Sequence, residues 1–379
     1  MFIAVPAETK TGETRVAATP ETVKKYVAAG CDVSVQAGAG LASDIADEAF
    51  EAAGAKIVAG AADLYKKADV VLKVSAPDAG ELKGLRKGTA VISQFAPFTN
   101  PLLKDYASAG LTCFALELVP RISRAQNMDV LSSQANIAGY KAVLMAAEHY
   151  KSFMPMMMTA AGTVTPARVL VMGAGVAGLQ AVATARRLGA VVEVFDVRPA
   201  VKEQVESLGA KFVEVEGGEE AEDAGGYAKE MSEEYKQRQS ELIDKHATDA
   251  DIIITTALIP GRPAPVLIKE QVVHAMKPGS VIVDLAAEMG GNCELTAAGS
   301  VVNRSDVTII GETNIPALMA ADASQLFARN VHNFLKPMLG GEGEGLNVDL
   351  EDEVIEASLL SRDGEMLKPQ FVGNGGAGK

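Results

Sequence analysis

The sequence predicts an α/β protein with two doubly wound, Rossmann-like domains that are joined by two long helices, with a cleft between the domains. Two observations lead to this fold class. Short apolar runs alternate with amphipathic helical patterns along most of the 379 residues. A glycine-rich strand–turn–helix motif near the middle, VLVMGAGVAGL, begins a second series of such units.

The first half of the chain contains six apolar runs of strand length. Between several of them lie stretches with apolar residues at helical spacing that end on glycine. This alternation predicts a mostly parallel sheet with helices on both faces. The expected strands are 1–5, 31–36, 55–58, 69–74, 89–95 and 112–118, and the expected helices are 20–30, 43–54 and 100–110.

The second half repeats the pattern after a long helix that we expect over 132–149. A second long amphipathic helix is expected over 321–339, and 353–367 resembles a hairpin with Asp363-Gly364 as its turn. We therefore divide the chain into one domain of 1–132 plus 325–379 and another of 133–324. The expected strands of the second domain are VLVM before the glycines, 191–196, 210–215, 250–258, 279–286 and 307–312.

Composition excludes several classes of protein. The net charge of −14 argues against a nucleic-acid or anionic-membrane surface, which requires a basic face. No stretch approaches the ~18 uninterrupted apolar residues of a membrane span. The N-terminal residues lack the pattern of a signal peptide, and three distant cysteines fit a reducing compartment. We therefore expect a cytoplasmic protein without direct membrane insertion.

The glycine motif predicts dinucleotide binding. Gly173, Gly175 and Gly178 form G-x-G-x-x-G between a strand and a helix, which would allow a tight turn, approach of a pyrophosphate and close packing of the helix. Asp196 ends the next strand 23 residues after Gly173, where a ribose-binding acid is expected. Its carboxylate favours NAD(H) over NADP(H), and Arg198 is expected to stack near the adenine or cap the loop.

The sequence offers no obvious acid or base for a dehydrogenase. Its four histidines, His149, His246, His274 and His332, lie in expected helices or polar stretches and not at strand ends that face a cleft. By contrast, residues 120–129, PRISRAQNMD, concentrate polar side chains between two apolar stretches. Composition alone makes this segment a solvated connection or a helix cap.

Several long motifs resemble the NAD(H)-binding component, domain I, of proton-translocating nicotinamide nucleotide transhydrogenases in the alanine dehydrogenase superfamily. They are PRISRAQNMDVLSSQANIAGYKAV, MMMTAAGTVTPARVLVMGAGVAGLQAVATARRLGA, DVRPAVKEQVESLGAKF, GGYAKEM, TTALIPGRPAPVLI, MKPGSVIVDLAAEMGGNCEL and AADASQLFARN. The resemblance covers nearly the whole chain. It implies direct hydride transfer from NADH to NADP⁺, which needs aligned nicotinamides and no acid–base residue.

The resemblance also implies partners and site residues. It implies a homodimer that docks on an NADP(H)-binding domain III, carried by a proton-conducting membrane domain II, at the cytoplasmic side of the inner membrane. Arg121, Gln126, Asp129 and Ser132 match the loop that orients the nicotinamide and its ribose, with Gln126 directed toward the partner's nucleotide. Arg124 is expected either to join this set or to serve the contact between domains.

The remaining cofactor contacts implied by the resemblance surround the dinucleotide motif and an expected mobile loop at about 216–240. The acidic stretch 216–223 within that loop reads as a charged excursion. The implied contacts are Val176, Ala177, Val197, Leu258 on the adenosine side, Gly226, Tyr227 at the tip of the loop, and Gln239.

Two alternatives remain. An alanine dehydrogenase-like enzyme shares the Arg15 and Lys73 positions, which bind the substrate carboxylate in that relative. The substrate-binding histidine of that relative is absent here, and Gln94 or Phe95 occupies its neighbourhood. The aspartate that precedes a glycine pair in that relative is Glu288 in this chain. A non-catalytic NAD(H)-binding redox sensor is the other alternative. The sequence does not decide the direction of flux, the relative affinities for NADH and NAD⁺, the stoichiometry with the partner, or whether domain I is a separate subunit.

Overall fold

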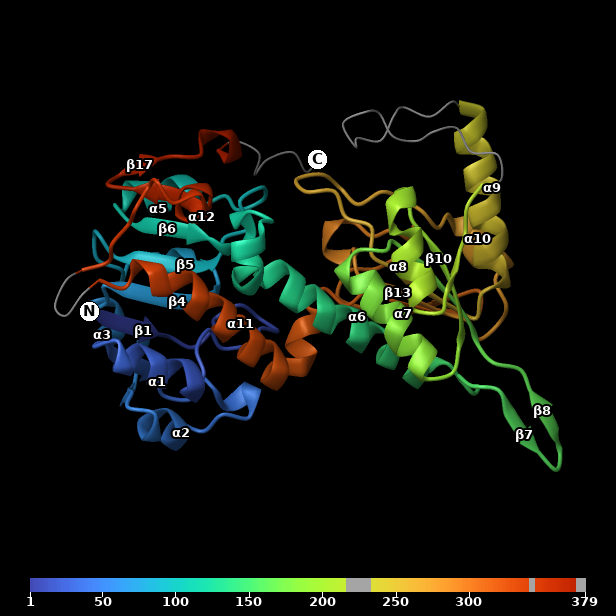
Figure 1. Cartoon of the computed structure of the whole chain (residues 1–379), viewed down its shortest axis with the longest axis horizontal. Coiled ribbons are helices and arrows are strands. Elements are labelled where there is room, and N and C mark those ends of the chain that lie inside the picture. The colour runs from blue at the N-terminus through green and yellow to red at the C-terminus, as the bar shows by residue number, and fades with distance from the viewer. Residues whose placement is uncertain (216–232, 341–344, 373–379) are drawn as a thin grey trace. The chain divides into compact units, whose positions relative to one another are not determined.

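The computed structural model describes residues 1–215, 233–340 and 345–372, which form two compact units (Figure 1). Unit 1 contains Met1–Gln134 and Pro316–Lys379, and unit 2 contains Ala135–Ile315. The first boundary expected from sequence falls two residues before this division, and the second falls nine residues after it.

Unit 1 is built on an eight-stranded sheet in the order β3-β2-β1-β4-β5-β6-β16-β17. The first six strands are parallel and the last two are antiparallel. The chain winds outward in both directions from β1 and β4, as in a doubly wound fold. The strands are β1 (Phe2–Val5), β2 (Asp32–Gln36), β3 (Lys56–Val58), β4 (Val70–Ser75), β5 (Ala90–Gln94), β6 (Thr112–Ala115), β16 (Leu359–Arg362) and β17 (Glu365–Met366).

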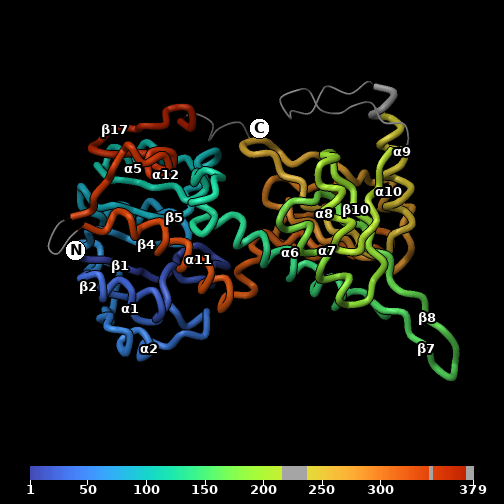
Figure 2. The backbone as a smooth tube through the Cα atoms, in the orientation of Figure 1, coloured from blue at the N-terminus to red at the C-terminus, as the bar shows by residue number. Residues whose placement is uncertain are grey.

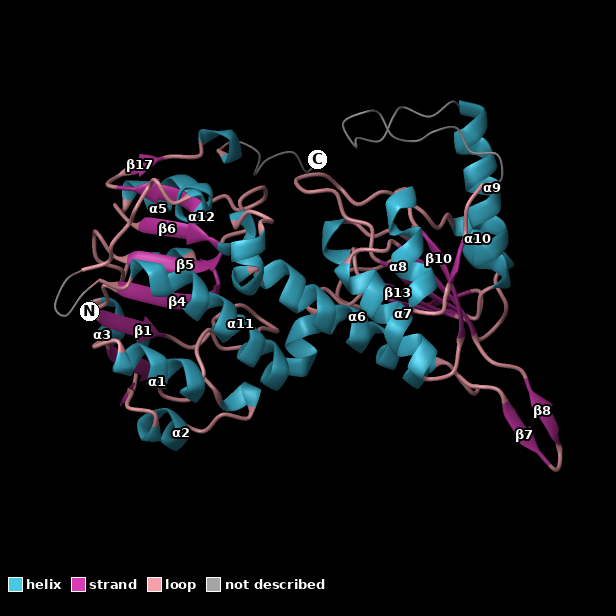
Figure 3. Ribbon diagram, in the orientation of Figure 1, coloured by secondary structure: helices cyan, strands magenta, loops and turns pink. Residues whose placement is uncertain are grey.

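Helices cover the sheet of unit 1 (Figure 3), and a separate apolar cluster is packed on each face. The 16-residue helix α11 contributes Phe327, Val331 and Phe334 to one of these clusters. The helices are α1 (Pro20–Ala28), α2 (Asp47–Ala52), α3 (Ala61–Tyr65), α4 (Ala79–Leu82), α5 (Leu103–Ser108), α11 (Ala320–Leu335) and α12 (Glu353–Ser358), with short 3₁₀ turns η1 (Leu41–Ser43), η2 (Leu116–Leu118), η3 (Ser123–Met128), η6 (Ile315–Met319, which begins in unit 2), η7 (Lys336–Met338) and η8 (Pro369–Phe371).

The C-terminal segment differs in part from the hairpin expected over 353–367. Its first six residues form α12, because the Asp352 side chain accepts hydrogen bonds from the N–H groups of Val354 and Ile355 and caps the helix. The hairpin is confined to β16 and β17. Asp363 (φ 55°) and Gly364 (φ 91°) form its turn with the positive φ values that a tight hairpin requires.

Unit 2 contains a seven-stranded sheet in the order β11-β10-β9-β12-β13-β15-β14. All neighbours are parallel except β14 and β15. The edge strand β14 was not expected, and the strand expected over 210–215 is only two residues long. The strands are β9 (Arg168–Met172), β10 (Val191–Phe195), β11 (Lys211–Phe212), β12 (Ile252–Thr255), β13 (Val281–Asp284), β14 (Val301–Arg304) and β15 (Val307–Ile310).

Only one of the two long helices runs from one unit into the other. Helix α6 (Val130–His149) crosses the boundary, whereas α11 lies wholly in unit 1 because its apolar face is buried in the core of that unit. The other helical elements of unit 2 are α7 (Val176–Arg187), α8 (Lys202–Ser207), α9 (Glu233–Asp249), α10 (Glu270–Ala275), η4 (Pro199–Val201) and η5 (Ala287–Met289).

A two-stranded arm projects from the body of unit 2 (Figure 2). It consists of β7 (Met157–Thr159) and β8 (Gly162–Val164), which pair only with each other among the described strands. Within the described ranges, no helix combines the length and apolar character that crossing a membrane requires.

Candidate functional site

The strand–turn–helix motif lies where the winding of the unit 2 sheet reverses, between β9 and β12. This is the position at which doubly wound sheets bind ligands. Gly173 follows β9 with φ +104°, which an L-residue rarely adopts, and a Cβ on it would lie 2.4 Å from the Thr256 Oγ1 atom. Gly178 lies in the first turn of α7, where a Cβ would be 1.8 Å from the Gly173 carbonyl oxygen.

Gly175 differs from both of these glycines. It is the N-cap residue of α7, its φ of −76° is ordinary, and a Cβ built on it would have no heavy atom within 4 Å. The motif therefore leaves open space directly above the amino terminus of α7, where backbone N–H groups favour an anion. This open space is what the predicted approach of a pyrophosphate to the backbone requires, and dinucleotide binding here stays a prediction.

Asp196 follows β10 at the same edge of the sheet, and its side chain is only 5% exposed. Its carboxylate accepts hydrogen bonds from Ala174 N (2.6 Å) and Arg198 N (2.8 Å). The Arg198 guanidinium completes the set through Nε (3.0 Å) and Nη2 (2.9 Å). Burial alone would raise the pKa of Asp196, but the hydrogen bonds from Arg198 and Ala174 outweigh it and lower this pKa. Asp196 is therefore an anion at neutral pH.

Arg198 was expected to stack near the adenine or cap the loop. In the structure its guanidinium pairs with the carboxylate of Asp196, and stacking on the adenine stays a prediction. Val176, Val197 and Leu258 are each more than 40% exposed, and they follow the adjacent strands β9, β10 and β12. Apolar side chains that remain exposed at this edge can cover the faces of an adenosine. That Val176, Val197 and Leu258 contact the cofactor stays a prediction.

The structure says less about the four remaining expected cofactor contacts. Ala177 is half-buried in α7, and Gln239 is half-buried in α9. Gly226 and Tyr227 lie outside the described residues, as do the acidic stretch 216–223 and most of the expected mobile loop.

Two residues of this site were missed in the sequence. The Thr256 hydroxyl lies 3.2 Å from the carbonyl oxygens of both Met172 and Gly173, so it fastens β12 to the glycine turn. The threonine pair at the end of the apolar run 250–258 is the signal that could have identified it. Gly139 of α6 packs against α7 so closely that a Cβ would lie 2.0 Å from the Ala177 carbonyl oxygen. No sequence pattern marks that contact.

The segment 120–129 lies in unit 1 and forms η3, which leads into α6. Asp129 accepts hydrogen bonds from Ser132 N (2.9 Å) and Ser132 Oγ (2.6 Å). This is the geometry of a helix N-cap, the structural role considered above for this segment. Two of the four residues expected to orient a nicotinamide are thus brought together, and both are half-buried.

Arg121 and Gln126 are exposed, and neither side chain has a hydrogen-bond or ion-pair partner among the described residues. Both are therefore available to a ligand. Arg124 pairs instead with Asp352 (2.6 Å) and Glu353 (3.4 Å) at the start of α12. These contacts are internal to unit 1 and give Arg124 a structural role there, and the two roles expected for it from the sequence stay predictions.

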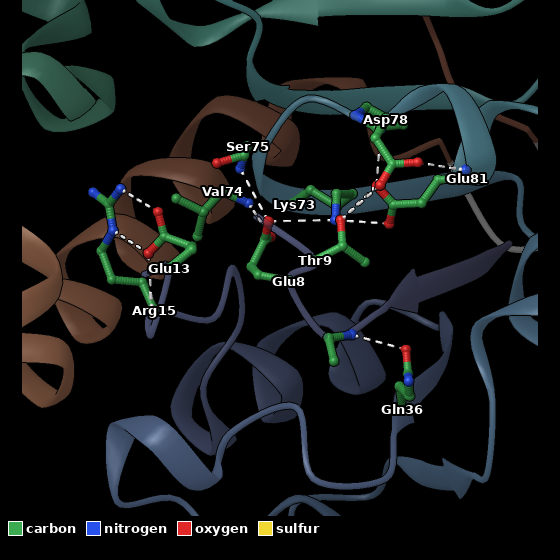
Figure 4. Close-up of polar contacts among 12 residues, drawn as sticks. Glu8, Thr9, Glu13, Arg15, Gln36, Lys73, Val74, Ser75, Asp78 and Glu81 are labelled. Atoms are coloured by element: carbon green, nitrogen blue, oxygen red, sulfur yellow. Dashed lines mark hydrogen bonds and ion pairs between the residues drawn. The ribbon is translucent and has the colours of Figure 1, made fainter. Parts of the chain in front are cut away.

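Arg15 and Lys73, the two cations that the resemblance matches to alanine dehydrogenases, are buried in unit 1 and paired with carboxylates of the chain. Lys73 Nζ, 0% exposed, lies 2.9 Å from Glu81 and 3.3 Å from Glu8 (Figure 4). Glu8 also accepts the N–H groups of Val74 (2.6 Å) and Ser75 (3.3 Å) at the end of β4. Burial raises the pKa of Glu8 despite the neighbouring Lys73.

Arg15 is held in a comparable way. Its guanidinium forms a two-bonded fork with Glu13, at 2.8 and 2.7 Å, and also donates to Gln134 Oε1 at 2.9 Å (Figure 4 shows the pair with Glu13). Charge-assisted forks of this kind fix the guanidinium plane. Both cations thus have carboxylate partners within their own unit.

No histidine occupies the end of β5, where the alanine dehydrogenase alternative requires one. Gln94 ends that strand and Phe95 is fully buried after it. The half-buried Glu117 accepts the N–H groups of Phe95 (3.0 Å) and Ala96 (2.6 Å) on its carboxylate, which holds Ala96 at φ +47°. Burial raises the pKa of Glu117. Its role here is to fix the chain after β5.

The four histidines lie on helices in the structure. His149 Nδ1 contacts the Met145 carbonyl oxygen (2.9 Å), His246 contacts Glu193 (2.8 Å), His274 contacts Ser305 and Glu270, and His332 packs on the ring of Tyr26. None of them follows the carboxyl end of a strand. The sequence-based expectation that they are packing or surface residues agrees with these positions.

Comparisons with known proteins identify the family. Residues 4–138 match the alanine dehydrogenase/PNT N-terminal domain and residues 142–369 match the alanine dehydrogenase/PNT C-terminal domain. One relative, from Rhodospirillum rubrum, is named as the first portion of NAD(P) transhydrogenase subunit alpha. It is 52% identical over 99% of this chain and 100% of its own length. The NAD(P) transhydrogenase subunit alpha of Haemophilus influenzae is 48% identical over 98% of this chain and 73% of its own length.

Two solved structures agree with this result. A transhydrogenase from Sinorhizobium meliloti superposes with a TM-score of 0.89 at 51% identity, over 97% of this chain and 100% of that chain. An L-alanine dehydrogenase superposes with a TM-score of 0.82 at 26% identity, over 98% of both chains. The fold is common to both kinds of protein, and the sequence is about twice as similar to the transhydrogenase.

Proposed function

The chain belongs to the alanine dehydrogenase/PNT family, and from that premise we propose that it binds NAD(H) and presents the nicotinamide for direct hydride transfer to NADP⁺ on a partner protein. When bound, NAD(H) supplies or accepts the hydride. The open cradle at Gly175, beside an ionised Asp196, is the observation that carries this proposal. It supports a pyrophosphate over α7 and a ribose diol at the carboxylate.

Asp196 would also set the preference for NAD(H). A carboxylate accepts hydrogen bonds from the two hydroxyls of a ribose, whereas it repels the 2′-phosphate of NADP(H). Since Arg198 already covers this carboxylate, the diol either shares Asp196 with the guanidinium or displaces it. The Arg198 guanidinium is 56% exposed and can turn into solvent, and the ribose hydroxyls would then replace the hydrogen bonds that it donates to the buried carboxylate.

Arg121, Gln126, Asp129 and Ser132 are proposed to orient the nicotinamide and its ribose. The side chains of Arg121 and Gln126 are exposed and unengaged among described residues, so they are available as donors. Direct transfer between two nicotinamides moves no proton, so these residues need only hold the ring in the reactive geometry, with carbon atoms about 3–3.5 Å apart. The absence of any histidine from the strand ends is consistent with such chemistry.

The partner would be an NADP(H)-binding transhydrogenase domain, carried by a membrane component that couples transfer to proton movement. In that arrangement the chain is located at the cytoplasmic face of the membrane through its partners. The relative from Rhodospirillum rubrum is named as one portion of a subunit, which supports a multi-component assembly.

The test is to titrate the purified chain with NADH and NADPH by fluorescence and then add a partner domain loaded with NADP⁺. We expect selective NADH binding, and hydride transfer only when the partner is present. Gln126→Asn should slow transfer more than it weakens binding, whereas Gln204→Asn, on the exposed face of α8, should change neither. Oxidation of NADH by the chain alone with pyruvate and ammonia would instead establish the amino-acid dehydrogenase alternative.

We also propose that the chain forms a homodimer through the arm of β7 and β8. Met156 and Met158 are 58% and 77% exposed, and no charged residue occurs from Phe153 to Thr165. A two-stranded hairpin has little stability of its own, and an exposed apolar surface of this kind is typical of an interface. A second copy supplies an identical uncharged surface, as a two-fold interface requires. Sedimentation velocity tests this proposal.

A further inference from the structure

One carbonyl group of η3 is held by two amide side chains of α11. Asn330 Nδ2 donates to the Asn127 carbonyl oxygen at 2.8 Å, and Asn333 Nδ2 donates to the same atom at 3.0 Å. Asn127 directly follows Gln126. The backbone at the exposed end of η3 is therefore held by side chains of a different helix.

The same Asn330 side chain reaches the start of α6. Its Oδ1 accepts a hydrogen bond from Ser133 Oγ at 2.7 Å, and Ser133 directly follows Ser132. One carboxamide, 8% exposed, thus bridges the two ends of the stretch 126–132 with its donor and its acceptor. That stretch contains three of the four residues proposed to orient the nicotinamide.

The surroundings of Asn330 make this bridge rigid. Its neighbours on α11, Phe327, Val331 and Phe334, are fully buried in the core of unit 1. A polar side chain on such an apolar face is costly to bury unless it is fully hydrogen-bonded. Asparagine offers both a donor and an acceptor at this position, whereas aspartate lacks the donor and alanine lacks both.

We infer that Asn330 is a positioning residue for hydride transfer: it sets the backbone from Gln126 to Ser132 so that the nicotinamide is held in the reactive geometry. This inference rests on the proposed function. Because transfer depends steeply on the separation of the two rings, loss of the bridge should reduce the rate of transfer more than the binding of the cofactor. A displacement near 1 Å costs up to about 10²-fold in rate.

The experiment compares Asn330→Ala and Asn330→Asp in the full chain with the NADP⁺-loaded partner domain. We expect the rate constant for hydride transfer to fall about 10- to 100-fold in both variants. The dissociation constant for NADH should stay near that of the wild type. Asn303→Ala, an exposed position on β14 of unit 2, should leave both quantities unchanged.

Val91→Ala is the control for a purely structural role. It removes buried volume from the apolar cluster on the other face of the unit 1 sheet, which includes none of residues 126–133, and it lowers the stability of the same unit, so transfer should be retained at temperatures where the variant is folded. The inference is overturned if Asn330→Ala transfers at the wild-type rate, or if transfer falls equally in Val91→Ala. Failure of the wild type itself to transfer with the partner would instead overturn the proposed function, and this inference with it.

Discussion

Substitution by alanine should lower the stability of the chain at Gly178 and the affinity for NADH at Gly175. A Cβ at Gly178 would lie 1.8 Å from the Gly173 carbonyl oxygen and 2.9 Å from its carbon, so α7 or the turn must move by more than about 1 Å. Overpacking of this kind costs about 3 kcal/mol, and the gain in helix propensity offsets about 1 kcal/mol. We expect Gly178→Ala to lower the free energy of unfolding by about 2 kcal/mol.

Gly175→Ala meets no such obstacle. No atom lies within 4 Å of the new Cβ, and φ is negative, so only the weak preference of an N-cap for glycine over alanine is lost, less than about 1 kcal/mol. The methyl group would, however, stand where a pyrophosphate must approach the backbone. Loss of one hydrogen bond to a charged group costs about 1.5–3 kcal/mol, or roughly 10- to 150-fold in NADH affinity.

Thermal unfolding by circular dichroism and titration with NADH well below the melting temperature separate the two effects. For a unit of this size, 2 kcal/mol corresponds to about 4–8 °C in melting temperature. Wild-type NADH affinity in Gly175→Ala would contradict the assignment of the cradle. An equal loss of stability in the two variants would contradict the distinction between the two glycines.

Three further predictions concern pH dependence, assembly and thiol reactivity. Arg329 and Lys25 lower the pKa of Glu21 from 4.5 to about 2, so this carboxylate adds stability above about pH 4.5 that is lost as the pH falls toward 2. Glu21→Gln should remove roughly 0.5 kcal/mol of it, as followed by unfolding between these pH values, whereas the exposed Glu51→Gln should not. Met158→Asp should yield monomers in sedimentation velocity. Val301→Asp, which replaces another exposed apolar side chain of unit 2, should leave the dimer intact. A dimer in both variants would exclude the arm as the dimer interface. Burial raises the pKa of all three cysteine thiols, so a thiol reagent at about pH 8 should modify none in the native chain and three after unfolding.

The repeating pattern of the sequence predicted most of the fold. Apolar runs and helical spacing identified the parallel strands of both sheets, because burial on two faces demands such runs. The pattern failed at residues 353–358, which read as a strand but form α12 because the neighbouring Asp352 caps a helix there. The pairing of Arg124 with that same helix start is a tertiary contact, which no local pattern contains. The arm of β7 and β8 carries an apolar signal that does not distinguish a buried segment from an exposed interface.

The sequence located those residues of the candidate site that lie close together along the chain, and it missed those that come from remote segments. Gly173, Gly175, Gly178 and Asp196 belong to one strand–turn–helix–strand unit with fixed spacing, so the sequence alone located them. Thr256 approaches the same turn from β12, more than 80 residues further along the chain. No periodicity records such a contact.

By itself, the sequence determined the fold class, the position of the dinucleotide turn and the family, since these depend on short-range spacing and on the identity of residues along continuous segments. The tertiary structure decided how individual side chains are used. It paired Lys73 and Arg15 with buried carboxylates and left the space at Gly175 open. It also brought Asn330 of α11 to the carbonyl of Asn127. Those outcomes depend on which strands and helices become neighbours, and distances between segments remote in sequence are fixed only when the chain folds.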